Sequence, residues 1–196
     1  MTELVLTLLA LTAVAPALTL LLRRRWVDPT VPVAGVILLL LAVAALLAAV
    51  TDDVTGWQRG AAATLAVAAA TTGGSDVVRA FFRAMRHEFD PRRDHPVPGR
   101  EGTRPPDAAP PRRSSESVLR GGVWIGYLER AAIAATLLAG WPEGVALVLA
   151  VKGVGRYPEL RGSSGSETDA SEAFIIGTLV SVLWAAAAAG TARLVG

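Results

Sequence analysis

The chain alternates long uncharged hydrophobic stretches with short polar segments. The first two stretches, residues 4–22 and 31–50, contain 19 and 20 consecutive uncharged residues. A helix rises about 1.5 Å per residue, so each stretch reaches about 29 Å or slightly more and can cross the hydrocarbon core of a membrane. Both are predicted to be spanning helices. Arginines follow the first stretch instead of preceding it, the reverse of a secretory signal peptide, so we expect this helix to be retained.

A third stretch, residues 60–75, is shorter and consists largely of alanine, threonine and glycine. Such residues contribute little to membrane insertion but allow neighbouring helices to approach closely. We therefore expect a third span in which the small residues face other helices. These residues are Ala61, Ala62, Ala63, Gly73 and Gly74.

The next segment, residues 76–90, is basic and amphipathic. It places Arg79, Arg83 and Arg86 at helical spacing between apolar and aromatic residues. This pattern is typical of a helix that lies at the membrane interface and attracts anionic lipid. A simple extension of the third span is an equally good interpretation.

Residues 90–117 differ sharply in composition, with seven prolines among 28 residues, no aromatic residue and scattered charges of both signs. This composition predicts a disordered linker. The linker divides the chain into an N-terminal three-helix membrane part with a basic amphipathic extension, residues 1–89, and a hydrophobic C-terminal part, residues 118–196.

Three further hydrophobic helices are predicted in the C-terminal part. Residues 118–140 and 144–157 are separated by a turn at Trp141 and Pro142, and residues 173–190 contain 18 uncharged residues. The predicted fold class is therefore all-α, a polytopic transmembrane helical bundle with six spans and a disordered cytoplasmic linker. Five spans are the alternative, because the third and fifth helices are the weakest candidates to cross fully.

Composition agrees with a membrane protein and limits the chemistry. Hydrophobic residues make up 52% of the chain, charged residues 18%, and the mean hydropathy is +0.45. A net charge of +2 argues against nucleic-acid binding. The absence of cysteine excludes disulfides and thiol chemistry, and no nucleotide-binding, serine-hydrolase or zinc-protease motif occurs. We therefore assign no catalytic residue, metal ligand or cofactor and favour a non-enzymatic function.

The distribution of basic residues predicts the orientation. If the arginines at 23–25 are cytoplasmic, 14 of the 19 basic residues lie inside and only Arg59 and Arg193 lie outside. Such an asymmetry satisfies the positive-inside rule. We expect a multi-pass protein of the bacterial cytoplasmic membrane, with both termini outside and residues 79–120 in the cytoplasm.

Charged residues interrupt the two helices on either side of the turn at Pro142. Four of them lie at similar distances from that turn, within about 6 Å of depth at helical rise: Glu129, Arg130, Lys152 and Arg156. Unpaired charges inside a membrane are costly, so we expect a paired set, with Glu129 and Arg156 as the preferred pair. Glu172 enters the last span nearby. The alternative is that these side chains extend to the interface and only set helix depth.

The surplus of cations in this cluster suggests what it binds. Glu129, Arg130, Lys152, Arg156 and Glu172 are the candidate residues for an anionic lipid head group or a membrane protein partner, which includes a second copy of the chain. The alternative is a small transporter or channel component that uses the same charges as a substrate or proton path.

Four segments also carry a resemblance. They read TGGSDVVR at 72–79, IGYLER at 125–130, KGVGRYPEL at 152–160 and EAFIIGTL at 172–179. Together they resemble a family of small, uncharacterised bacterial integral membrane proteins of actinobacterial type. The family pattern has IGxLER, a lysine followed four residues later by arginine and then Glu-Leu, and a final glutamate with IIGTL. Gly153 and Ala173 depart from it, where a serine and an aromatic residue are expected. The resemblance implies membrane location and draws attention to the charged residues.

Overall fold

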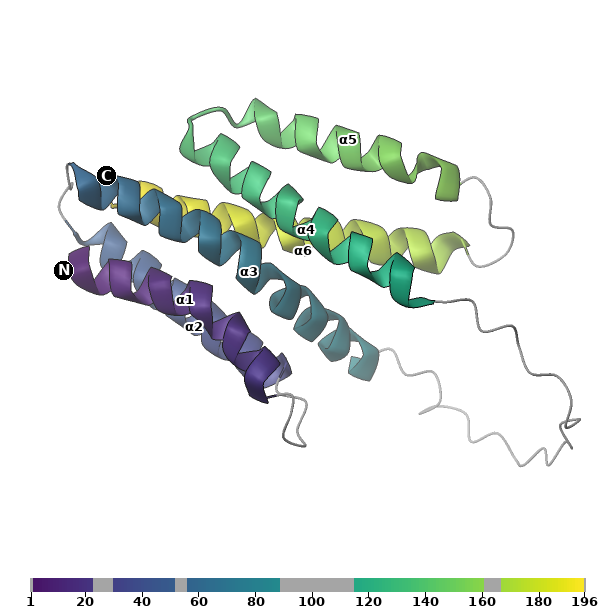
Figure 1. Ribbon diagram of the computed structural model, residues 1–196, viewed down its shortest axis with the longest axis horizontal. Helices are drawn as coiled ribbons and strands as arrows, with labels where there is room; N and C mark the ends of the chain where they lie inside the picture. The colour runs from purple at the N-terminus through teal and green to yellow at the C-terminus, as the bar shows by residue number, and fades with distance from the viewer. Residues whose placement is uncertain (1, 23–29, 52–55, 89–114, 161–166, 196) are drawn as a thin grey trace, which may run out of the picture.

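The computed structural model describes residues 2–22, 30–51, 56–88, 115–160 and 167–195, which form helices and no strand. Side chains are described over slightly narrower ranges. The helices follow one another as α1 (Thr2–Leu22), α2 (Thr30–Ala49), α3 (Trp57–Glu88), α4 (Ser115–Leu138), α5 (Glu143–Leu160) and α6 (Glu167–Arg193) (Figure 1). The predicted all-α class is confirmed for these residues. The proposed linker, residues 90–117, lies outside them except for its last three residues, which begin α4.

Successive helices run in opposite directions. Figure 1 shows the start of α1 and the end of α6 at one end of the bundle, together with the end of α2, the start of α3 and the turn between α4 and α5. Two side-chain hydrogen bonds join helices at that end. Gln58 Nε2 donates to Glu3 Oε1 over 3.3 Å, and Arg193 Nη1 donates to the Leu137 carbonyl over 3.2 Å. The C-terminal ends of α1, α3 and α5 and the N-terminal ends of α2, α4 and α6 therefore lie at the opposite end.

The centre of the bundle is the contact between α3 and α6, which joins the N-terminal and C-terminal halves. Small side chains make this close packing feasible. On α6, Ala185, Ala188 and Ala189 are fully buried. On α3, Gly73 is buried so closely against Trp184 that a Cβ at this position would lie 2.6 Å from the indole ring.

The small residues predicted to face other helices do so. Ala62, Gly73 and Gly74 are buried, and Ala61 and Ala63 are partly buried. Because a glycine or alanine surface lets two backbones approach, the weak hydrophobicity of residues 60–75 reflects a packing surface.

The basic segment after residue 75 continues α3 without interruption as far as Glu88. The extension interpretation is therefore correct, and a separate interfacial helix is not formed. Phe82 packs on α6, where a Cβ on Gly177 would lie 3.2 Å from the Phe82 ring. Asp76 is buried and forms an ion pair with Arg79, with 2.8 Å between Oδ1 and Nη2.

Three helical segments in the described part of the chain are long and apolar enough to cross a membrane: Val31–Ala49, Trp57–Met85 and Ser171–Arg193. This is fewer than the six spans that the sequence predicts. The apolar segment Thr2–Ala17 of α1 is shorter, and α4 and α5 carry charged residues along their length. Three such helices indicate a membrane protein.

Candidate functional site

Arg130 lies at the junction of α3, α4 and α6 and is only 4% exposed. Its guanidinium group donates hydrogen bonds to several neutral oxygen atoms. Nε and Nη2 donate to the Thr71 carbonyl over 3.2 and 3.1 Å, and Nη2 also donates to Ser75 Oγ over 2.9 Å. Nη1 donates to Ser181 Oγ on α6 over 3.4 Å. The planar fork of arginine suits such a divided set of acceptors.

Two glycines make room for this side chain. A Cβ on Gly74 would lie 2.6 Å from Arg130 Nε, and a Cβ on Gly126 would lie 3.4 Å from Nη1. The Tyr127 ring covers the guanidinium from α4, with 5.4 Å between Cζ and the ring centroid. The sequence IGYLER thus places a small residue, an aromatic ring and the cation on one helix so that the arginine can turn inward.

None of the described contacts of Arg130 is with a carboxylate. The buried acid on α3, Asp76, is paired with Arg79. A buried cation requires hydrogen bonds to be tolerated, and here backbone and hydroxyl oxygens supply them. The seam between α3, α4 and α6 therefore holds a positive charge that its described hydrogen-bond partners do not neutralise.

Glu129 precedes Arg130 in sequence but faces another helix. Consecutive helical residues are rotated by about 100°, so the carboxylate points towards α5. There it forms an ion pair and hydrogen bond with Lys152. The ammonium group also lies 5.6 Å from the centroid of the Phe174 ring on α6. Both side chains of the pair are partly exposed, in contrast to Arg130.

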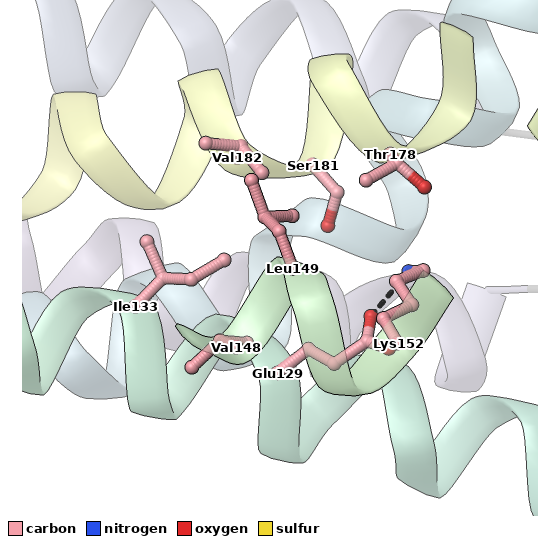
Figure 2. A pocket seen from close by; sticks show the side chains of 8 residues that line it. All are labelled: Glu129, Ile133, Val148, Leu149, Lys152, Thr178, Ser181 and Val182. Atoms are coloured by element: carbon pink, nitrogen blue, oxygen red, sulfur yellow. Dashed lines mark hydrogen bonds and ion pairs between the residues drawn. The ribbon is translucent and has the colours of Figure 1, made fainter. Parts of the chain in front are cut away.

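This ion pair borders a cleft between α4, α5 and α6 (Figure 2). The cleft encloses about 190 Å³ including the space at its mouth, and it is too narrow to hold a water-sized sphere. Its walls are Glu129 and Ile133 from α4, Val148, Leu149 and Lys152 from α5, and Thr178, Ser181 and Val182 from α6. Figure 2 shows the Ser181 hydroxyl turned into the space between α6 and the other two helices.

The structure brings together three of the five candidate residues. Glu129 and Lys152 are in contact, and Arg130 reaches the same cleft through Ser181. The expected partner of Glu129, Arg156, lies on α5 but its side chain is outside the described ones. Glu172 is exposed on α6 and does not line the cleft. The interface interpretation is wrong for Arg130, whose side chain is directed into the bundle.

Sequence reasoning missed the neutral residues that complete the site. Ser75 and Ser181 accept hydrogen bonds from Arg130, and Thr178 lines the cleft. Trp184 anchors α6 on α3 by donating from Nε1 to the carbonyls of Ala69 and Ala70, each over 3.2 Å. The sequence carries only a weak signal for these residues. Hydroxyl side chains inside otherwise apolar helices often form hydrogen bonds between helices.

Comparison of the chain with protein-family models, with curated proteins and with solved structures finds no match. The resemblance to small bacterial membrane proteins stays a prediction for this reason. The function of the chain is therefore inferred from the site itself.

Proposed function

We propose that this chain is a non-enzymatic integral membrane protein of the bacterial cytoplasmic membrane that crosses it six times and binds an anionic lipid at the mouth of the cleft between α4, α5 and α6. The start of α1 and the end of α6 lie at the same end of the bundle, which supports an even number of spans. Apolar side chains are also exposed on the helices outside the three long apolar segments, including Leu11 on α1, Leu128 on α4 and Val151 on α5. Lipid is the solvent that suits such surfaces.

The orientation proposed from the basic residues agrees with the arrangement of the helices. The C-terminal ends of α1, α3 and α5 share one end of the bundle with the N-terminal ends of α2, α4 and α6, and the sequences that follow α1, α3 and α5 contain arginines. At the opposite end, Trp57 and Trp141 are exposed, as aromatic residues are at a membrane–water interface. Reporter fusions test this orientation: we expect Pro98 in the cytoplasm and Asp53 outside. A reporter at Pro98 that is active outside would contradict it.

One observation carries the proposed binding function. The Lys152 side chain is partly exposed at a cleft whose described charges do not balance. Lys152 and Arg130 supply two positive charges, and Glu129 supplies one negative charge. An anion at the mouth of the cleft, beside Lys152, would neutralise the remaining positive charge. In surroundings of low dielectric constant, such an interaction is stronger than it would be in water.

The surroundings of the cleft favour a lipid as the source of this anion. Leu179 and Leu183 of α6, which flank the lining residues, are exposed, as is Val151 beside Lys152. A ligand that reaches the cleft across these side chains must itself be partly apolar. Towards the end of α5, Gly153 and Gly155 are exposed and have open space in place of a side chain, so no bulk at these two positions shields Lys152.

Lipid retention tests this proposal. The full chain is extracted in mild detergent, equilibrated with micelles that contain phosphatidylglycerol or phosphatidylcholine, and examined by native mass spectrometry. We expect preferential retention of phosphatidylglycerol, reduced about tenfold in Lys152→Met, which removes one charged hydrogen-bond donor. Arg59→Met is the matched control, because it removes an exposed cation outside the cleft. Equal retention of both lipids by the unaltered chain would overturn the proposal.

A soluble competitor distinguishes a lipid from a free anion. Inorganic phosphate carries the same chemistry as a head group but has no apolar part. We expect millimolar phosphate to leave the retained phosphatidylglycerol in place. Displacement by phosphate would show that the anion alone is recognised and would contradict the lipid part of the proposal.

The charged residues Glu129, Arg130 and Lys152 lie deep in the bundle, and this depth favours a second candidate, a small transporter or channel component. Thr71, which accepts two hydrogen bonds from Arg130, lies 14 residues from either end of the apolar segment Trp57–Met85. Charges near the middle of a span often line substrate or proton paths. Proton flux into liposomes that contain the full chain, followed with a pH-sensitive dye, tests this candidate. The transporter or channel candidate requires that the unaltered chain conducts protons, that Lys152→Met abolishes this flux and that Arg59→Met leaves it unchanged.

A further inference from the structure

Ser181 connects the buried arginine to the cleft. Its Oγ accepts a hydrogen bond from Arg130 Nη1 over 3.4 Å, and the same residue forms part of the cleft wall that faces Lys152. Figure 2 shows this hydroxyl directed towards the interior of the cleft. A second hydroxyl, that of Ser75, also accepts from Arg130 but lies on α3 and does not line the cleft.

The hydroxyl proton of Ser181 is available for a ligand. A serine hydroxyl accepts through its lone pairs and donates one hydrogen. Thr191 on the same helix donates its hydrogen to the Ala187 carbonyl, one turn earlier. Ser181 makes no such donation to any residue that the structure describes. With the guanidinium as donor on one side, the O–H of Ser181 is polarised and faces the cleft on the other.

We infer that Ser181 is a ligand-binding residue. When Lys152 turns away from Glu129 and the cleft widens, Lys152 and Ser181 hold a head group bearing one negative charge, such as a phosphodiester. This inference rests on the proposed lipid-binding function and specifies its chemistry. Lys152 contributes the ammonium donor and Ser181 a hydroxyl donor, behind which Arg130 provides positive charge. The described side chains leave one positive charge uncompensated, which matches a phosphodiester better than the doubly charged phosphomonoester. Thr178 adds a hydroxyl on the same wall.

The paired variants Ser181→Ala and Ser75→Ala test this assignment, because each removes one hydroxyl acceptor of Arg130 and only the first alters the cleft. We expect Ser181→Ala to lower phosphatidylglycerol retention about tenfold, as loss of a hydrogen bond to a charged group does. Ser75→Ala should leave retention unchanged but lower the melting temperature more, because its hydrogen bond is shorter, 2.9 Å against 3.4 Å. Ser181→Thr, which keeps the hydroxyl, should restore retention.

The pattern of results separates the two proposals. If Lys152→Met lowers retention but Ser181→Ala and Ser75→Ala behave alike, the role of Ser181 is overturned while the lipid site stands. If the unaltered chain shows no preference for phosphatidylglycerol, the proposed function itself fails. Phosphatidic acid, a phosphomonoester, measures the charge preference at a pH where it is doubly ionised. We expect it to be retained no better than phosphatidylglycerol, and stronger retention would overturn the assignment of a singly charged ligand.

Discussion

Two cations near the middle of this bundle occupy opposite kinds of environment. Arg130 is enclosed between α3, α4 and α6 and donates hydrogen bonds only to neutral oxygens among the described residues, whereas Lys152 on α5 is partly exposed and contacts a carboxylate. The first arrangement holds helices together, because Arg130 on α4 donates hydrogen bonds to both α3 and α6. The second leaves a partly exposed ion pair at the mouth of a cleft, where the partner of Lys152 can be exchanged. Structural and binding roles are thus divided between neighbouring charges.

The largest expected effect concerns the space around Arg130. Gly74→Val adds a branched side chain where even a Cβ would lie 2.6 Å from Arg130 Nε. The guanidinium cannot move away without losing its hydrogen bonds, so we expect about 3 kcal/mol of destabilisation. Gly35→Val, on α2 with open space around its Cα, is the control. Thermal unfolding in detergent measures both, and similar melting temperatures would show that the Arg130 seam is not tightly packed.

Substitutions in the ion pair should lower the stability of the protein less than Gly74→Val does. Loss of Glu129 and loss of Lys152 should also differ in their effect. Glu129→Gln leaves Lys152 without a carboxylate and Arg130 as a second cation nearby. We expect about 2 kcal/mol of destabilisation, less than for a fully buried pair because the Lys152 and Glu129 side chains are 21% and 12% exposed. Lys152→Met should cost less, since it removes the surplus charge. Thermal stability that falls more for Lys152→Met than for Glu129→Gln would contradict this account of the cluster.

Exchanging the two basic residue types gives the smallest and most specific test. Arg130→Lys removes the fork that reaches Thr71, Ser75 and Ser181 together, and we expect about 1.5 kcal/mol of destabilisation. Lys152→Arg keeps a cation beside Glu129 and should change the melting temperature little. Equal sensitivity at the two positions would remove the distinction between a structural arginine and an exchangeable lysine.

Much of the architecture follows from local pattern. Helix existence follows from uninterrupted apolar runs, and the glycine and alanine content of residues 60–75 correctly indicated a packing surface. The number of helices apolar enough to span a membrane was harder to predict. Charged residues in α4 and α5 lower the mean hydropathy of these helices, so length and composition alone do not decide whether they cross.

The candidate site was predicted only in outline. Helical rise correctly placed Glu129, Arg130 and Lys152 at a common depth, since rise depends on residue number alone. The pairing of Glu129 with Lys152 was not predicted, and neither was the contribution of Ser181. Ion pairing depends on how each helix is rotated about its axis, and rotation is set by packing against neighbours.

The sequence by itself determined the helices, their order and the level of the charged residues, because these depend on hydrophobicity and on distances along one chain. Only the tertiary structure decided that Arg130 turns towards α3 and α6 while Glu129 turns towards α5. The two residues differ by about 100° around α4, so the same sequence permits either to face the cleft. Which one does is fixed by Gly74, which leaves space for the arginine, and by Trp184, which holds α6 against α3. These contacts join residues more than 50 positions apart, and no local pattern encodes them.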